Sequence, residues 1–589
     1  MKRLWVLEGM LALGGAFAAA AAYLGRPTVP TAPPLEAPRP AYLGSSGCQG
    51  CHPGAYASWQ HTYHRTMTRR PQDLKWDGTV APSLPVQLSD RHFAFELTEQ
   101  DGRIMARGPD LHVLAQLFYE LGQRAKEGGS GAPTLATIQR ALERAPEAER
   151  PLALVTGSHH YLAFWLENGQ DRELRQLPFV YHLAEGRWAP RSQAFLEPPE
   201  AAPYIATWNS NCIQCHAVAG EPQETEWRDE AGALHVRFQT RVAELGIACE
   251  ACHGPGRAHA SHYRNPLQRV GLGDTPKAAR LVSPAKLDAA AGSAICGQCH
   301  AYFVPRDEAR FWETGFVTSY LPGEALDRSR QLLQPASAPH DAPAISRELG
   351  SIFWPDGTIR VGGREYAGLT MSACYEKGSG ERKLGCMSCH SMHEGAADDQ
   401  LLPKVAESPD APCQSCHEAT PEHSGHPAGS IGASCVNCHM PKTTYALLKS
   451  IRSHRIQVPN PRRTDVPSAC ALCHVDRPPA WFAPAEPAEP TDTDAVGVGV
   501  RAALSGNAAE RAIYAAALAS PETRQTIGDA LPRSLLAVLA EDPYHAVRRI
   551  AERGLASLPP STSTAPAVDP VLIQRLRSLR DERDIVISE

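Results

Sequence analysis

The pentapeptide Cys386-Met387-Ser388-Cys389-His390 opens the stretch that decides the fold, residues 386–474. Its pattern, Cys-x-x-Cys-His, occurs three more times in that stretch and four times upstream. The eight copies use sixteen of the seventeen cysteines and leave only Cys374. They begin at Cys48, Cys212, Cys249, Cys296, Cys386, Cys413, Cys435 and Cys470.

This spacing is typical of the covalent attachment of c-type haem. The two thiols add to the two vinyl groups along one porphyrin edge, and the histidine supplies one axial ligand to the iron. We therefore predict eight c-type haems, held through Cys48, Cys51, Cys212, Cys215, Cys249, Cys252, Cys296, Cys299, Cys386, Cys389, Cys413, Cys416, Cys435, Cys438, Cys470 and Cys473. The predicted proximal iron ligands are His52, His216, His253, His300, His390, His417, His439 and His474.

Zinc sites and disulfide frameworks also use paired cysteines. Neither requires a histidine directly after the second cysteine, whereas all eight pairs here have one. The pattern therefore favours haem over both alternatives.

The sixth position on each iron needs a ligand from elsewhere in the chain. Of 24 histidines, sixteen remain after the motif histidines, enough for one distal imidazole per haem. His61 and His64 have the spacing of one helix face, and the adjacent His159 and His160 would point to opposite sides of an extended segment. The predicted distal ligands are His64, His160, His259, His393, His426 and His454.

Two of these nominations depend on neighbouring haems. His393 would share a helix face with His390, so it cannot reach the far side of the same haem and should bind an adjacent iron. His259 follows the third motif closely enough to do the same. His423 and His426 both precede the seventh motif, and only His426 is nominated.

The composition predicts a mixed α+β fold with much irregular structure, organised around eight haems. The 589 residues include 51 Pro and 46 Gly, and 43% are hydrophobic, which indicates a globular chain rich in turns. Porphyrin would supply apolar surface that side chains would otherwise provide. The net charge of -6, made more negative by haem propionates, argues against nucleic acid as a partner.

The chain divides at changes of composition. Residues 1–25, with Lys2 and Arg3 before an apolar run, predict an export signal, with a retained membrane anchor as the alternative. A Pro-rich linker, 26–41, precedes the haem-bearing domain at 42–483, which contains a β-rich and helical insert at about 76–200. A second linker, 484–494, leads to residues 495–589. Either signal outcome predicts a periplasmic or other extracytoplasmic location.

Local patterns predict secondary structure in the insert and at the C-terminus. Alternation over 76–108, with a turn at Asp101-Gly102, predicts strands, whereas 110–149 has helical spacing. Residues 495–589 resemble paired HEAT-type helices, with Arg548-Arg549 on the outer side. Two or three such units are marginal alone, so this part should pack on the cytochrome body.

The stretch 42–476 resembles bacterial exported multihaem c-type cytochromes, in particular the branch similar to the tetrahaem cytochrome associated with hydroxylamine oxidation. The resemblance rests on Tyr42-x-Gly-x-x-x-Cys-x-x-Cys-His with Tyr56, Trp59 and His64; Gly157-Ser-His-His; Cys249-Glu-Ala-Cys-His-Gly-Pro-Gly; Cys386-Met-Ser-Cys-His-Ser-Met-His393; and Cys435-Val-Asn-Cys-His-Met-Pro. It implies stacked haem pairs that pass electrons, and it supports His64, His259, His393, His426 and His454 as distal ligands. The helical insert and the helical C-terminus depart from the pattern.

These features predict an electron carrier with mostly bis-histidine haems, in anaerobic or other respiratory metabolism, and assign no catalytic residue. Its partners would be other cytochromes or a quinol-oxidising membrane complex, which the C-terminal helices could recruit. The alternative is an oxidoreductase that acts on a small nitrogen or sulfur compound at one haem with an open sixth position. Cys374 keeps this alternative open, although a buried inert thiol is the commoner use of a lone cysteine.

Overall fold

The computed structural model of the chain describes residues 35–127, 134–169, 171–201, 203–228, 234–315, 320–335, 349–395, 400–418, 423, 425–460, 463, 465–482, 495–560 and 568–587. The predicted export signal, most of the Pro-rich linker and the linker at 484–494 lie outside these residues. Within these ranges, no helix has both the length and the apolar character needed to cross a membrane.

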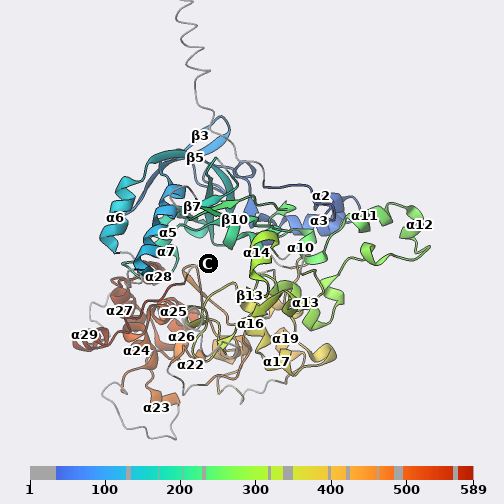
Figure 1. Cartoon of the computed structure of the whole chain (residues 1–589). Coiled ribbons are helices and arrows are strands. Elements are labelled where there is room, and N and C mark those ends of the chain that lie inside the picture. The colour runs from blue at the N-terminus through green and yellow to red at the C-terminus, as the bar shows by residue number, and fades with distance from the viewer. Residues whose placement is uncertain are drawn as a thin grey trace, which may run out of the picture.

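An eight-stranded antiparallel sheet forms the upper part of the molecule (Figure 1). Its strands follow one another as a meander, and the short β1 pairs with the edge of β5. Asp101 and Gly102 adopt φ angles of 50° and 74°, and the tight hairpin between β3 and β4 predicted at this dipeptide is confirmed. The strands are β1 Thr68–Arg69, β2 Val86–Ser89, β3 Ala94–Gln100, β4 Arg103–Pro109, β5 Glu147–Thr156, β6 Tyr161–Glu167, β7 Leu174–His182 and β8 Arg187–Pro190.

Two helices, α5 (Leu111–Glu127) and α6 (Leu135–Arg144), join β4 to β5 and cover the sheet. Leu111 and Leu114 are 1% and 0% exposed and pack with Phe95, Leu97 and Phe164 of the sheet. This core is therefore built from side chains alone, in the insert between the first and second haem motifs.

The haem motifs lie in a different kind of structure, made of short helices and turns. Around the first three motifs these are α2 (Ser46–Gln49), α3 (Pro53–Gln60), α4 (Tyr63–Thr66), α8 (Trp208–Asn211), α9 (Ile213–His216) and α10 (Cys249–His253). Later motifs use α13 (Ala289–Gly297), α19 (Ala411–Gln414), α21 (Cys435–His439) and α22 (Ala469–Cys473). The apolar clusters here are small, which agrees with a core that porphyrin would complete.

The described residues of the C-terminal part, 495–560 and 568–587, form six helices, which lie below the sheet in Figure 1. Their largest cluster of buried apolar side chains also contains Leu196, Trp354, Tyr445 and Leu472 from the haem-bearing part, so the predicted packing on the cytochrome body is confirmed. The backbones of Leu196 and Ile587 exchange two hydrogen bonds, which returns the end of the chain to the centre. The helices are α24 Val498–Ser505, α25 Ala508–Leu518, α26 Pro521–Ile527, α27 Ala530–Leu539, α28 His545–Ser557 and α29 Pro570–Ser578.

One prediction about this part is wrong. Arg549 does not lie on an outer face, because it forms an ion pair with Glu185 in the 3-10 helix Leu183–Glu185 between β7 and β8, and Arg553 reaches the same carboxylate at 3.4 Å. Burial alone would raise the pKa of Glu185, but the arginines around it lower that pKa to about 2. The two arginines therefore fasten α28 to the sheet.

A buried ion pair holds the C-terminal helices together. Nε of Arg511 in α25 lies 2.7 Å from Oδ2 of Asp542, ahead of α28, and the side chains are 1% and 0% exposed. Asp542 also accepts a hydrogen bond from the backbone N–H of Tyr544. Arg580, with a side chain 7% exposed, lies 3.7 Å from the same carboxylate. Removal of Asp542 would therefore leave buried guanidinium groups without their counter-charge.

We expect Asp542→Ala to lower the free energy of unfolding of the C-terminal helices by about 3–5 kcal/mol. Urea denaturation followed by far-ultraviolet circular dichroism would measure the change. The control is Glu541→Ala, because the neighbouring Glu541 side chain is 75% exposed and should contribute about 0.5 kcal/mol or less. Equal stability of the two variants would contradict the prediction.

Candidate haem-binding sites

Each haem motif closes one turn of helix. In six motifs the backbone N–H of the histidine donates to the carbonyl of the first cysteine at 2.9–3.0 Å, and in the other two the pentapeptide is itself a helix, α10 or α21. One turn brings positions i, i+3 and i+4 to one face. The two thiols and the imidazole of a motif therefore face the same space, as covalent haem attachment requires.

A second imidazole lies opposite six of the eight motif histidines. The ring centroids are 6.0–6.4 Å apart, and five of the six pairs have nearly parallel planes. The sixth, His64 with His300, has planes at 66°. The pairs, motif histidine first, are His52–His259, His253–His393, His300–His64, His390–His454, His439–His423 and His474–His426.

This separation fits an iron atom between the two rings. A metal–imidazole bond of about 2 Å, with about 1.2 Å more to the ring centroid, gives roughly 6.4 Å across a bis-imidazole iron. Two imidazoles in direct contact would lie much closer, as His159 and His160 do at 3.9 Å. The six gaps therefore have the width that bis-histidine haem needs.

Hydrogen bonds fix which ring nitrogen faces the gap in five of the six pairs. Both rings donate Nδ1–H away from the gap in two pairs, His253–His393 and His300–His64, and one ring does so in three more pairs, which leaves the lone pair of Nε2 directed toward the other ring. Burial lowers the pKa of His64 to about 4, which keeps its imidazole in the neutral form that binds iron. The acceptors are Val282 O for His253 (2.7 Å), Gln457 O for His439 (2.8 Å), Gln400 Oε1 for His64 (2.7 Å), Ala279 O for His259 (3.1 Å), Ser58 Oγ for His393 (3.1 Å) and Arg452 O for His454 (3.2 Å).

His300 differs because its acceptor is a carboxylate. Its Nδ1 lies 2.8 Å from Oε2 of Glu365 in α16 (Glu365–Thr370). Burial alone would lower the pKa of His300, but this hydrogen bond and the carboxylate charge outweigh it and raise that pKa. An anionic acceptor makes the imidazole a stronger electron donor to a metal.

Five of the six predicted distal ligands lie opposite a motif histidine: His64, His259, His393, His426 and His454. His160 does not. It stacks on His159 in a turn rather than in extended chain, and its Nδ1 lies 3.3 Å from Nζ of Lys449. In its place the structure brings His423 opposite His439. The only feature of the sequence that pointed to His423 as a ligand was its position ahead of the seventh motif, and His426 has the same feature.

The predictions for His64 and His393 relied on a shared helix face, and this local structure is wrong in both cases. His61 caps the end of α3 and His64 lies in α4, so they do not share one helix face. His393 lies in a turn after the 3-10 helix Cys386–Ser388, and the backbone of His390 forms an isolated β-bridge with Leu401. The two histidines therefore do not share a helix face. His393 nevertheless lies opposite His253, the histidine of a different motif.

Among the described residues, His216 and His417 have no imidazole at this distance. His216 is partly buried, with its Nδ1 covered by protein, and burial lowers its pKa to about 4. His417 is exposed, and so is the neighbouring Cys416. His340, a further histidine, lies outside the described residues.

The first and third motifs are joined by a buried carboxylate. Glu250, the second residue of the third motif, is 4% exposed and accepts hydrogen bonds from the backbone N–H groups of Leu43 and Gly44 at 2.9 and 2.8 Å. It also accepts from Gly256 at 2.6 Å, which turns the chain toward His259. One side chain therefore sets the positions of two motifs and of one distal imidazole.

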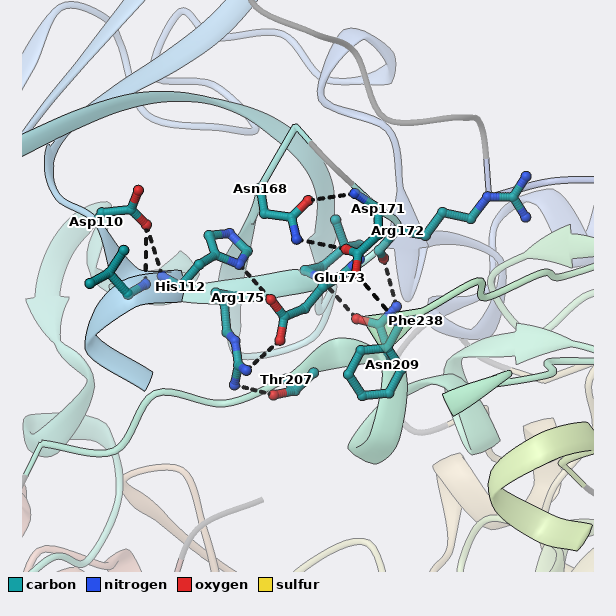
Figure 2. Close-up of polar contacts among 12 residues, drawn as sticks. Asp110, His112, Asn168, Asp171, Arg172, Glu173, Arg175, Thr207, Asn209 and Phe238 are labelled. Carbon is teal, nitrogen blue, oxygen red and sulfur yellow. Dashed lines mark hydrogen bonds and ion pairs between the residues drawn. The ribbon is translucent and has the colours of Figure 1, made fainter. Parts of the chain in front are cut away.

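The second motif is fastened to the sheet by a polar network (Figure 2). Asn209, in the helix just before Cys212, is fully buried, accepts from the backbone N–H of Leu174 at 2.8 Å and donates to Arg172 O at 2.7 Å. Arg175 links Thr207 to Glu173, whose other oxygen lies 2.8 Å from Nδ1 of His112 in α5. The insert therefore positions the second motif.

Unsatisfied donors lie beside the second motif. Nε and Nη2 of Arg191, Nε of Arg364 and Nε1 of Trp208 are buried and have no acceptor in the described structure. Arg191 and Arg364 interact electrostatically with Cys212 and Cys215. Haem propionates are anionic acceptors, and such groups would satisfy these donors.

Cysteines of different motifs lie next to one another. All seventeen cysteines are free of disulfides. Side-chain hydrogen-bonding contacts join Cys48 to Cys249, Cys215 to Cys299, Cys296 to Cys386, and Cys413 to Cys435. Electrostatic interactions join Cys252 to Cys296 and Cys299, Cys389 to Cys413, and Cys438 to Cys470.

The leftover Cys374 lies in α17 (Ala373–Glu376), which is also near a motif. It interacts electrostatically with Cys413 of the sixth motif and is half-buried. Among the described residues, no group of three or more His, Cys, Asp or Glu side chains has the arrangement of a metal-ion site.

Three families match parts of the chain. Residues 191–254 match the cytochrome c554 and c-prime family, 380–422 match the doubled CXXCH motif, and 422–482 match the cytochrome c552 family. Together these matches contain six of the eight motifs. No curated protein matches the chain. A solved structure, that of the outer cell wall cytochrome OcwA, is similar at 17% identity and a TM-score of 0.43, over 88% of this chain and 99% of that one.

We expect Glu365→Gln to raise the reduction potential of the haem between His64 and His300, because the carboxylate charge favours ferric iron. The rise should be on the order of 50 mV, measured by a spectroelectrochemical titration. Glu99→Gln, an exposed glutamate on β3, is the control and should leave all potentials unchanged. Unchanged potentials in both variants would contradict the assignment.

Proposed function

Because the chain is a multihaem c-type cytochrome, we propose that it carries electrons through eight covalently held haems, most of them bis-histidine. The observation that carries the proposal is the set of six imidazole pairs at 6.0–6.4 Å. Two imidazoles per iron close the metal to substrate and leave a change of oxidation state as its reaction. The residues then supply position and potential, and the haem supplies the electron chemistry.

The contacts between cysteines support a continuous path. In the holoprotein each of these sulfurs would join a haem edge, so two sulfurs close to one another support two neighbouring haems. Side-chain hydrogen-bonding contacts connect the first motif to the third, the fourth to the fifth and the sixth to the seventh. Electrostatic interactions, which act over longer distances, connect the third to the fourth, the fifth to the sixth and the seventh to the eighth. The second motif joins this line at the fourth.

The proposed setting is outside the cytoplasm. The sequence of residues 1–25 supports export, with cleavage or retention as an anchor, and covalent haem attachment supports the same location. The proposed partners are other cytochromes or a quinol-oxidising membrane complex. The C-terminal helices, proposed to be HEAT-like, would form a separate docking surface on the cytochrome body.

We expect His259→Ala to convert one haem from low spin to high spin, because the iron of His52 would lose its second imidazole. Electron paramagnetic resonance of the oxidised protein would detect one added high-spin signal. His262→Ala is the matched control, since His262 lies in the same helix, α11 (Arg257–Tyr263), and contacts Tyr263 rather than a motif histidine. It should leave the spectrum unchanged.

Mass spectrometry of the purified protein should show eight added haem groups. Fewer than eight would contradict the proposed cofactor count. A His259→Ala spectrum identical to that of the control would contradict the pairing but not the count.

A second candidate function is oxidation or reduction of a small nitrogen or sulfur compound at one open haem. What favours it is His216, which is partly buried and has no second imidazole within the described residues. Unsatisfied donors of Arg191 and Arg364 lie beside its motif and suit an anionic ligand as well as a propionate. Exposed His417 lacks such surroundings.

For this candidate we expect a high-spin ferric signal in the unmodified protein that shifts when nitrite or sulfite is added. The same signal should persist unchanged in His340→Ala, because that histidine would not be the missing ligand. A spectrum of the unmodified protein that is wholly low spin would rule the open site out.

A further inference from the structure

An arm of the chain, residues 257–280, projects from the body as α11, α12 (Pro266–Arg269) and the 3-10 helix Lys277–Ala279 (Figure 1). We refer to these residues as the basic arm. They contain five basic side chains and one acidic one, a net charge of +4 in a chain whose net charge is -6. The basic residues are Arg257, Arg264, Arg269, Lys277 and Arg280.

None of these five cations has an ion-pair partner in the described part of the chain, and all five residues are exposed. Where their side chains are held, the acceptor is a neutral backbone carbonyl. Arg257 donates to Tyr42 O, Arg269 to Tyr263 O and Arg280 to Thr275 O. The arm therefore presents uncompensated positive charge to solvent.

The same arm exposes an apolar centre. Leu267, Val270 and Leu272 are 58%, 72% and 58% exposed, within six residues of one another. An apolar centre inside a polar or charged rim is the usual anatomy of a protein–protein interface. A free surface loop has no structural need for three large apolar side chains in this position.

The arm also reaches a predicted redox centre. His259 in α11 lies opposite His52 at 6.4 Å, and its Nδ1–H donates to Ala279 O at the other end of the arm. A protein seated on the arm would therefore lie beside the edge of the first haem.

We propose that the basic arm is the docking site of an acidic redox protein that exchanges electrons with the first haem. This inference rests on the proposed electron-carrier function. Opposite charges raise the rate of encounter and orient the partners, and a small apolar centre gives the short-lived complex typical of electron transfer. In each transfer one electron leaves the reduced partner and converts ferric haem to ferrous haem, and no proton moves.

The test uses fully reduced flavodoxin, an acidic electron donor, mixed with the oxidised holoprotein in a stopped-flow spectrophotometer. In each encounter the flavin hydroquinone becomes the semiquinone and one haem is reduced. The variant is Arg264→Glu, Arg269→Glu and Lys277→Glu combined. The control reverses three exposed cations far from this arm, Lys75→Glu, Arg140→Glu and Arg144→Glu.

At about 10 mM ionic strength we expect the arm variant to react at least about tenfold more slowly than the unmodified protein, and to lose most of the salt dependence. The control should stay within about twofold of the unmodified rate. A basic monohaem cytochrome c, used as an oxidant of the reduced protein, should react no more slowly with the arm variant. Leu267→Ser, Val270→Ser and Leu272→Ser combined should weaken flavodoxin binding while the salt dependence remains.

Equal flavodoxin rates for the arm variant and the unmodified protein would overturn the inference. So would binding of the arm to phosphatidylglycerol vesicles without any effect on the flavodoxin rate, which would identify a membrane surface instead. Failure of the proposed function itself would look different, because the protein would then lack haem or resist reduction by dithionite. If the protein holds all its haems and the arm variant reacts with flavodoxin at the unmodified rate, the docking site is refuted and the proposed function stands.

Discussion

The structure depends on one constraint, the separation of two imidazoles across a gap about as wide as an iron with its two axial bonds. One ring of each pair is fixed by its own motif, since a single helical turn joins it to both thiols. The other ring comes from a segment that the fold must bring to the opposite side. His64 and His300 are 236 positions apart and lie 6.4 Å from each other. These gaps stay open only if the surrounding protein is rigid enough not to collapse into them. We call this rigid surrounding structure the frame.

The frame is supplied by two cores that contain no haem motif cysteine. One lies between the sheet and its covering helices, and the other joins the C-terminal helices to Trp354, Tyr445 and Leu472. The motifs lie between them in short helices with small apolar clusters of their own. Polar side chains then position the motifs: Asn209 ties the second motif to the sheet, and Glu365 orients the imidazole of His300. The departures from the resembled family, the insert and the helical C-terminus, are therefore the parts that build this frame.

Attachment to haem could be predicted from the sequence because the whole signal lies in five consecutive residues. Distal ligands could be predicted only in part, because their signal is tertiary. His393 was assigned to a neighbouring iron, and it lies opposite His253, although the helix on which that assignment relied is absent. His160 and His423 show the limit of local spacing. The backbone at His159 and His160 turns instead of extending, which stacks the two rings, and His423 differs from His426 by nothing that its neighbours in sequence reveal. Arg549 illustrates the same limit for the fold, because its carboxylate partner is 364 positions away.

The interactions between cysteines of different motifs place the proposed haems in a spatial order that differs from the order of the motifs along the chain. The first motif adjoins the third, not the second, and the second adjoins only the fourth among these contacts. A haem on such a branch is not needed to carry an electron from the first haem to the eighth. His216, the partly buried one of the two motif histidines without a second imidazole in the described residues, belongs to this branch. Six of the seven irons on the linear path would have two imidazoles, with the exposed His417 as the exception, and the side position at His216 would lack one within the described residues. Such an arrangement would separate conduction from chemistry. The two candidate functions would then occupy different haems of the same molecule, and the spin state of the second haem decides whether the branch conducts electrons or consumes them.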